Sequence, residues 1–213
     1  MPGSPTRGRL YVIVAPSGTG KTSLVKAARQ ALPEIGFSVS HTTRNPRPNE
    51  VPGRDYHFTD VPTFRRMIGE GAFLEYAQVF DNYYGTSEAA VETELAAGHD
   101  LILEIDWQGA AQVRRRLPDS VQVFILPPSR EALEQRLRQR GTDGDEVIAR
   151  RLKDSVTELS HWREFPFVVV NDRFEDALAD LTRLLRGNSR GLEASRPGLA
   201  DFAAGLLAQT PQK

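Results

Sequence analysis

The sequence predicts an α/β fold in which a parallel sheet is covered by helices on both faces. Short apolar runs alternate along the chain with longer amphipathic segments, a pattern typical of βαβ units. The first run, Leu10–Ala15, leads through a glycine-containing loop directly into a helix. Segment 38–98 differs, because its β-hairpin character indicates a mixed αβ insertion in the core pattern.

The core elements are expected wherever β-branched apolar runs or helix-spaced apolar residues recur. A polar lead-in, residues 1–8, precedes them, and Pro33 ends the first helix. Further core strands are expected at Phe37–Ser40, Asp100–Asp106, Val121–Leu126 and Phe167–Val170. Further core helices are expected at Trp107–Arg116, from the capping Ser129 to Arg140, at Asp145–Trp162 and at Phe174–Leu185.

The insertion opens with a proline-rich loop, His41–Gly53. Alternating or β-prone residues then predict strands at Arg54–Phe58, Phe73–Phe80 and Tyr83–Thr86. Asp60 and Ser87 are expected to cap helices at Val61–Gly69 and Glu88–Ala97. Beyond residue 187 the composition shifts to Gly, Ser, Arg and Pro, so 188–213 is expected to be a flexible tail; Leu199–Gln209 could be a small helix or disordered.

Composition limits the possible functions. The 213 residues are enough for one domain with a sizeable core, and the net charge of −1 gives no overall field favouring nucleic acid or a membrane surface. There is no cysteine, so disulfides and thiolate chemistry are excluded. No apolar run could span a bilayer, and the N-terminus lacks the apolar region of a secretory signal. A cytoplasmic location is expected.

The loop after the first strand has a phosphate-binding signature. Its residues run Ala15, Pro16, Ser17, Gly18, Thr19, Gly20, Lys21, Thr22. Glycines let successive backbone N–H groups wrap an anion, and the helix N-terminus adds its dipole. Lys21 would reach the β- and γ-phosphates of a nucleotide, and the Thr22 hydroxyl suits a Mg²⁺ ligand shell. Ala15 replaces the first glycine of the strict pattern. The alternative is an ordinary glycine-rich turn.

Other polar residues are expected at the same edge of the sheet, because ligands bind where parallel strands end. Glu104 and Asp106 end one strand, and Asn171 and Asp172 follow another. The acids could hold Mg²⁺, directly or through water, or a substrate hydroxyl. Asp106 could also cap the helix that begins at Trp107, and the two roles are compatible.

A second phosphate site is possible in the insertion. Arginine forks match phosphate oxygens, and tyrosine hydroxyls donate further hydrogen bonds; the residues are Arg44, Arg47, Tyr56 and Tyr84. The alternative is a solvated loop with scattered arginines. Glu75, in an otherwise apolar strand, could accept two N–H bonds from a guanine edge, whereas adenine presents an acceptor there. An exposed strand-face glutamate is the alternative.

A further arginine set surrounds the loop at 141–144 and could neutralise charge during phosphoryl transfer: Arg136, Arg140, Arg150 and Arg151. Interspersed acids favour a solvated, salt-bridged helix face for some of them. The four histidines have no metal-ligand spacing.

Taken together, these residues resemble the guanylate kinase family. The matching stretches are APSGTGKT, FSVSHTTRNPRP, GRDYHF, GAFLEYAQVFDNYYGT, LEIDWQGA, FILPPS, RLRQRGTD and FVVVND. They occur in order between residues 10 and about 187, so the resemblance implies a kinase domain at 1–187. It also implies that 38–98 is the GMP-binding insertion and 127–155 a helical lid, which close over GMP and ATP and exclude water.

The resemblance assigns roles to the matching positions. The GMP phosphate would be held by Arg44, Arg47, Tyr56 and Tyr84, and the guanine read by Glu75 with Ser40 and Thr86. Asp106 matches an active-site acid, and Glu104 stands where many members have Asp. Arg136, Arg140 and Arg151 match lid and catalytic arginines, and Asn171 matches a residue near the ATP adenine.

The implied reaction is Mg²⁺-dependent transfer from ATP to GMP, and to dGMP as well, without a covalent enzyme intermediate. The expected partners are these nucleotides, with no nucleic acid or membrane, and the chain would act as a monomer or homodimer. Two rival interpretations are a non-catalytic peptide-binding module of similar sequence and a related kinase with another phosphorylated acceptor. The module is disfavoured because Gly20, Lys21 and Thr22 are present.

Overall fold

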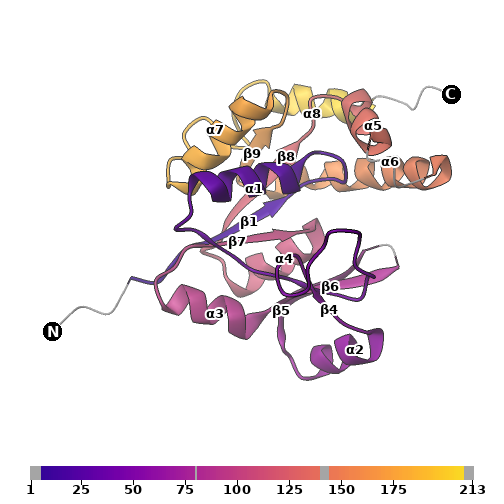
Figure 1. Cartoon of the computed structure of the whole chain (residues 1–213). Coiled ribbons are helices and arrows are strands. Elements are labelled where there is room, and N and C mark those ends of the chain that lie inside the picture. Colours follow the sequence, from indigo (N-terminus) through magenta and orange to yellow (C-terminus); the bar gives the residue numbers. More distant parts are fainter. Residues whose placement is uncertain (1–5, 80, 140–143, 209–213) are drawn as a thin grey trace. The chain divides into compact units, whose positions relative to one another are not determined.

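The computed structural model describes residues 6–79, 81–139 and 144–208. The chain forms two compact units (Figure 1). Unit 1 consists of Met1–Val12 and Pro33–Val121, and unit 2 of Ile13–Leu32 and Gln122–Lys213. Unit 1 therefore extends beyond the expected insertion, 38–98, on both sides.

The predicted parallel sheet is confirmed. It has five strands in the order β2-β7-β1-β8-β9. Their bounds are Gly36–Phe37 for β2, Leu101–Ile105 for β7, Leu10–Val14 for β1, Val121–Leu126 for β8 and Phe167–Val170 for β9. The pairs β2–β7 and β8–β9 are parallel. All residues of β1 are buried, as the continuous apolar run indicates for a strand covered on both faces.

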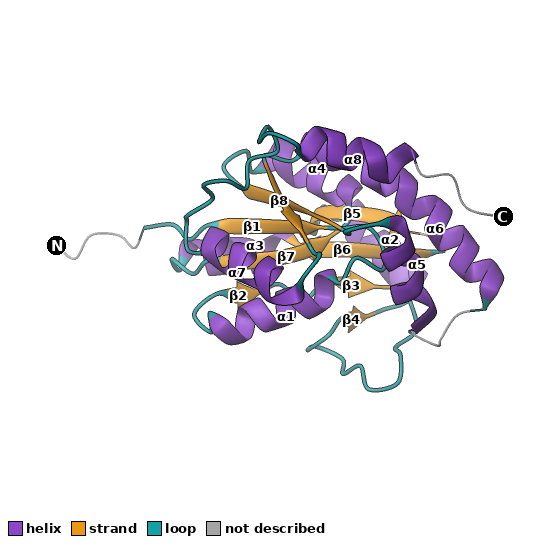
Figure 2. Ribbon diagram, turned by 90° about the horizontal axis from the view of Figure 1, so that it is seen from above, coloured by secondary structure: helices purple, strands orange, loops and turns teal. Residues whose placement is uncertain are grey.

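Unit 1 contains a second, four-stranded sheet in the order β4-β3-β6-β5. The strands are His57–Phe58 for β4, His41–Thr42 for β3, Asn82–Ser87 for β6 and Phe73–Val79 for β5. Strands β5 and β6 pair antiparallel and lie side by side in Figure 2, with a register shift between Phe73 and Glu75. Strand β3 pairs antiparallel with β6 and parallel with β4.

Two expectations for this region are wrong. The proline-rich loop predicted from His41 begins instead as β3, because His41 and Thr42 pair with β6. The strand predicted at Arg54–Phe58 is confined to its last two residues. The backbone N–H groups of Arg54 and Asp55 both donate to the Val51 carbonyl, at 3.1 and 3.0 Å, so this part of the chain is a turn.

The helices of unit 1 begin where the sequence predicts. They are α2 at Val61–Gly69, α3 at Glu88–Ala96 and α4 at Trp107–Arg116. Asp60, Ser87 and Asp106 each accept a hydrogen bond from a backbone N–H in the first turn of the helix that follows, which satisfies a donor that the helix itself leaves unpaired.

Unit 2 contains α1 at Lys21–Ala31, α5 at Arg130–Gln139, α6 at Asp145–Ser160, α7 at Phe174–Leu185 and α8 at Leu199–Ala208. Helices α1 and α7 pack together (Figure 1). The helix predicted to run to Trp162 ends at Ser160, and a 3₁₀ turn, His161–Glu164, follows it and buries Trp162.

The segment after residue 187 is not a flexible tail as far as Ala208. Leu192, Leu199, Ala203 and Leu206 are buried, and α8 contacts α6. Arg196 donates from Nη1 to the carbonyls of Val168 and Leu192, at 2.8 and 3.0 Å. These anchors are spaced too irregularly to show as a pattern in a sequence rich in Gly and Ser. Residues 209–213 lie outside the described residues.

Among the described helices, none combines the length and hydropathy that crossing a membrane requires.

Arg196→Met should reduce the stability of the fold. The substitution keeps an apolar stem but removes the donor to the partly buried carbonyls of Val168 and Leu192, so we expect the free energy of unfolding to fall by about 1–3 kcal/mol. Denaturant unfolding measures it. The matched control is Arg173→Met, because that side chain is 76% exposed and its ion pair with Asp176, at 3.6 Å, is a surface contact. Equal stability of both variants would contradict an anchoring role.

His41→Phe should reduce the pH dependence of stability. Burial, and then the neighbouring His57 at a ring separation of 4.7 Å, lower the pKa of His41. At pH values above the ordinary histidine pKa of about 6.5, the ring is neutral in both states. Below that pH the unfolded chain binds the proton first, so the wild-type free energy of unfolding falls.

Denaturant titrations between about pH 7.5 and 5.5 test this, and His41→Phe should lose less stability than the wild type over that interval. His99→Gln is the control, since the His99 side chain is 61% exposed. If His41→Phe and the wild type lose the same free energy of unfolding over this interval, His41 is not the source of the pH dependence.

Candidate functional site

The phosphate-binding loop joins β1 to α1 in unit 2. Gly18 and Gly20 have φ angles of +85° and +95°, which residues other than glycine rarely adopt. The Thr19 N–H donates to the Pro16 carbonyl at 3.2 Å. Lys21 is the first residue of α1. Ala15 is not among the residues with positive φ. The loop therefore needs glycine at Gly18 and Gly20 but tolerates a side chain at position 15.

Side chains far away in the sequence hold this loop by its backbone. Asn171, at the end of β9, is buried and donates from Nδ2 to the Thr19 carbonyl at 2.7 Å. Arg136 on α5 donates to the same carbonyl at 3.0 Å and to the Asn171 carbonyl at 3.1 Å. A Cβ on Gly20 would lie 2.6 Å from Asn171 Nδ2, so glycine is also required there for close packing.

Helix α6 holds the other end of the loop, an arrangement that sequence reasoning missed. The Ser17 N–H donates to Glu158 Oε2 at 3.0 Å, and Ser155 Oγ donates to the carbonyls of Ser17 and Arg151 at 3.3 and 2.7 Å. Arg151 therefore lies one turn before a residue that is fixed to the loop. Arg140, the other predicted arginine of this region, lies outside the described residues.

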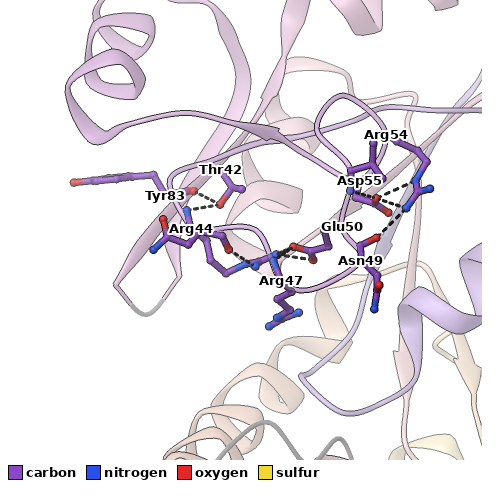
Figure 3. Close-up of polar contacts among 10 residues, drawn as sticks. Thr42, Arg44, Arg47, Asn49, Glu50, Arg54, Asp55 and Tyr83 are labelled. Atoms are coloured by element: carbon purple, nitrogen blue, oxygen red, sulfur yellow. Dashed lines mark hydrogen bonds and ion pairs between the residues drawn. The ribbon is translucent and has the colours of Figure 1, made fainter.

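In unit 1, Arg44 lies in a loop whose polar groups are closely paired (Figure 3). Its Nη2 donates to both carboxylate oxygens of Glu50, at 2.8 and 3.0 Å, and its Nη1 to the Asn45 carbonyl at 2.7 Å. The Arg47 N–H donates to Glu50 at 2.7 Å, while the Arg47 side chain is exposed. Thr42 Oγ1 donates to the Tyr83 carbonyl at 3.0 Å and fixes the start of the loop to β6.

The two predicted tyrosines lie together near Arg44. The rings of Tyr56 and Tyr84 are edge to face, with centroids 6.1 Å apart, and the Arg44 Cζ lies 5.5 Å from the Tyr56 ring centroid. Burial, and then the negative charge of Glu104, raise the pKa of Tyr56 to about 12. The Tyr56 hydroxyl is therefore protonated and can donate a hydrogen bond at neutral pH. Three of the residues predicted to form a phosphate site, Arg44, Tyr56 and Tyr84, therefore lie together, and Arg47 is exposed on the same loop.

Glu75 is buried rather than exposed on the strand face. It is 3% exposed, and Thr86, which is 0% exposed, donates from Oγ1 to Glu75 Oε1 at 2.5 Å across the β5–β6 pair. Gly109 on α4 makes room for this carboxylate, because a Cβ there would lie 2.3 Å from Glu75 Oε2. Gly109 was missed as a candidate, since its only signal in the sequence is the absence of a side chain.

The remaining candidates have local structural roles. Asp106 caps α4, accepting from the Gly109 N–H at 2.8 Å and from Gln108 Nε2 at 3.2 Å. Glu104 is half-buried on β7. Ser40 is half-buried before β3, and its carbonyl accepts from the His57 N–H at 2.9 Å. Within the described ranges, no group of three or more His, Asp or Glu side chains could hold a metal ion.

Comparison with known proteins matches these features over almost the whole chain. A family model described as guanylate kinase matches residues 7–188. The guanylate kinase of Methylococcus capsulatus is 54% identical over 202 residues, which cover 95% of this chain and 99% of the relative. That of Chromohalobacter salexigens is 52% identical over 205 residues, covering 96% of this chain and 95% of the relative.

A solved structure agrees with the sequence comparison. The crystal structure of guanylate kinase from Anaplasma phagocytophilum superimposes with a TM-score of 0.71 at 33% identity, covering 87% of this chain and 88% of that chain. The matched region includes both the loop around Lys21 and the strands that carry Glu75 and Thr86. The chain therefore belongs to the guanylate kinase family.

Proposed function

We propose that this protein transfers the γ-phosphoryl group of ATP to the phosphate of GMP, giving ADP and GDP, and that it also accepts dGMP. The observation that carries the proposal is the buried Glu75–Thr86 pair on a chain that also has a phosphate-binding loop with Lys21. A peptide-binding module would need neither. A kinase for another acceptor would not need a carboxylate buried beside Gly109.

Guanine recognition follows from the hydrogen-bonding capacity of Glu75. An ionised carboxylate only accepts hydrogen bonds, and guanine presents two neighbouring N–H donors where adenine presents an acceptor. Thr86 donates to Oε1 and fixes the plane of the carboxylate, and the missing side chain at Gly109 makes room for Oε2. Adenine would place an acceptor against this carboxylate, and the loss of that hydrogen bond costs about 1–3 kcal/mol or more for a charged group. Ser40 is proposed to complete the recognition of the base.

Each substrate phosphate has its own group of donors. Arg44, Arg47, Tyr56 and Tyr84 would bind the GMP phosphate, which is the acceptor. The backbone N–H groups of the loop and Lys21 would bind the ATP phosphates. Direct transfer needs the acceptor oxygen in line with the γ-phosphorus and neutralisation of the charge on the transferring group, and it requires no covalent intermediate. Arg136, Arg140 and Arg151 are proposed to add to that neutralisation, and Asn171 to lie near the adenine.

Magnesium fits the proposal as an ion that arrives with ATP. Mg²⁺ prefers oxygen ligands and usually takes several from phosphates and water, so it needs only one or two from the protein. The Thr22 hydroxyl at the start of α1 is a suitable oxygen donor. When bound, the ion would withdraw charge from the phosphate oxygens. Asp106 is the second proposed ligand, acting through water, because both of its carboxylate oxygens already accept hydrogen bonds in α4.

The amino-acid composition supports a proposal about the partners and the cellular location of the protein. The net charge of −1 gives no overall field that would attract nucleic acid or a membrane surface, so small nucleotides are the proposed partners. The absence of cysteine is consistent with the reducing cytoplasm, where ATP and GMP are found. We propose that the chain acts there as a monomer or homodimer.

The reaction is tested by a coupled assay of ADP release with Mg²⁺ and ATP, using GMP, dGMP, AMP, CMP and UMP in turn. We expect turnover with GMP and dGMP only, and Lys21→Met should reduce kcat by about 100-fold or more because it removes charge stabilisation at the transferring phosphate.

Glu75→Gln should reduce kcat/KM for GMP by about 10- to 100-fold by weakening recognition of the base. Turnover with another monophosphate, or an unchanged rate in Glu75→Gln, would overturn the role of Glu75.

Gly109→Ala should impair GMP use selectively. The new Cβ would lie 2.3 Å from Glu75 Oε2 and 3.2 Å from Asp106 Oδ1, so the carboxylate must move. We expect KM for GMP to rise about tenfold or more, equivalent to about 1.4 kcal/mol, while KM for ATP changes by less than about twofold. Gly69→Ala is the control, because a Cβ at Gly69 in α2 meets nothing within 4 Å. Equal KM values for GMP in Gly109→Ala and Gly69→Ala would contradict the role of Gly109 in positioning the Glu75 carboxylate.

A further inference from the structure

We propose that Glu50 is a positioning residue of the GMP site, which sets the guanidinium of Arg44 in place before the phosphate arrives. The inference rests on the proposed function, because it takes the GMP phosphate as the ligand of Arg44. Glu50 itself is an acid and would not contact a phosphate. Its role would be exerted through Arg44.

The geometry gives Glu50 two partners at once. Both carboxylate oxygens accept from Arg44 Nη2, at 2.8 and 3.0 Å, and Oε2 also accepts from the Arg47 N–H at 2.7 Å (Figure 3). Asn49, which precedes Glu50, has a φ angle of +74° and turns the chain at this point. The carboxylate therefore joins the side chain of one predicted phosphate ligand, Arg44, to the backbone of another, Arg47.

The pair is protected from water and restrained on further sides. The side chains of Arg44 and Glu50 are only 15% and 18% exposed. Arg44 Nη1 donates to the Asn45 carbonyl at 2.7 Å, and Arg44 Cζ lies 5.5 Å from the Tyr56 ring centroid. A free arginine side chain loses rotamer entropy when it is fixed, so a side chain that is already fixed binds a ligand without that loss.

The charge of Glu50 is maintained in this environment. Burial alone would raise the pKa of Glu50, but hydrogen bonds from Arg44 and the Arg47 N–H, together with the charge of Arg44, hold that pKa below its ordinary value. The carboxylate is thus ionised at neutral pH. The guanidinium has five N–H donors, so Arg44 can keep Glu50 and the Asn45 carbonyl and still donate to a phosphate. Arg44 is therefore held in position by Glu50 without losing its capacity to bind a phosphate.

The first experiment compares GMP with guanosine, which lacks the phosphate. In Glu50→Ala we expect KM and Kd for GMP to rise about 10- to 100-fold, as for loss of a charge-assisted contact, while Kd for guanosine and KM for ATP change by less than about threefold. Calorimetry gives the two Kd values, and the ADP-release assay gives the KM values. A Kd for GMP within about twofold of the wild type, in folded protein, would overturn the proposal.

A double-mutant cycle tests whether Glu50 acts through Arg44. If it does, adding Glu50→Ala to Arg44→Gln should change Kd for GMP by less than about threefold, although each single substitution weakens binding. Effects that multiply would overturn the positioning role. If Glu50→Ala lowers the melting temperature so far that the protein is unfolded under assay conditions, Glu50→Gln, which keeps the size but not the charge, takes its place in the cycle.

The loop offers a matched control in Arg54→Gln. Arg54 donates from Nε and Nη2 to Asp55, at 3.0 and 2.7 Å, and to the Asn49 carbonyl at 3.2 Å, without contacting Glu50. Arg54→Gln should leave Kd for GMP within about twofold of the wild type. An effect as large as that of Glu50→Ala would show general loosening of the loop and overturn the proposal. Wild-type turnover with GMP is measured alongside, so a failure of the proposed reaction is seen separately from a failure of the Glu50 variants.

Discussion

The hydrogen bonds accepted by the Thr19 carbonyl are the constraint on which the phosphate-binding loop depends. A loop that presents its N–H groups to an anion must direct carbonyls away from it, and those carbonyls need donors of their own. Here Asn171 and Arg136 supply them, at 2.7 and 3.0 Å. On α6, Ser155 supplies a donor to the Ser17 carbonyl, whereas Glu158 accepts a hydrogen bond from the Ser17 N–H. Loop, strand end and helices therefore depend on one another for position.

In unit 1, several carboxylate side chains are held by hydrogen bonds from the protein. Glu75, Asp106 and Glu50 are each fixed by donors from the protein: the Thr86 hydroxyl, the Gly109 N–H, and the Arg44 guanidinium. A carboxylate that is withdrawn from water must be paired, and pairing also fixes its orientation. The side chains proposed to recognise the nucleotide thus also determine the local structure around them.

The sequence was sufficient for features whose causes are local. Helix caps at Asp60, Ser87 and Asp106 depend on residues three positions away, and strands β1, β7, β8 and β9 on continuous apolar runs. The strand expected at Phe37–Ser40 is wrong beyond its first residue, because β2 is Gly36–Phe37 and its position is set by pairing with β7. Features set by distant partners could not be predicted. The Ser17–Glu158 contact joins residues 141 positions apart, and the burial of Glu75 depends on the pairing of β5 with β6 and on a glycine in α4. For Leu199–Gln209 the sequence left a small helix and disorder both open, and the structure has α8 there. The buried position of Leu192 before it could not be predicted from the polar composition around it.

The raised pKa of Tyr56 has a consequence for the alkaline range. A phenol of ordinary pKa begins to lose its proton near pH 9–10 and would then present a negative oxygen to an incoming phosphate. With a pKa of about 12, the Tyr56 hydroxyl still carries its proton there. A phosphate monoester, meanwhile, is fully ionised above about pH 7, since its second pKa is about 6. If the GMP phosphate binds here as proposed, the Tyr56 hydroxyl therefore remains able to donate a hydrogen bond to the dianion in this pH range.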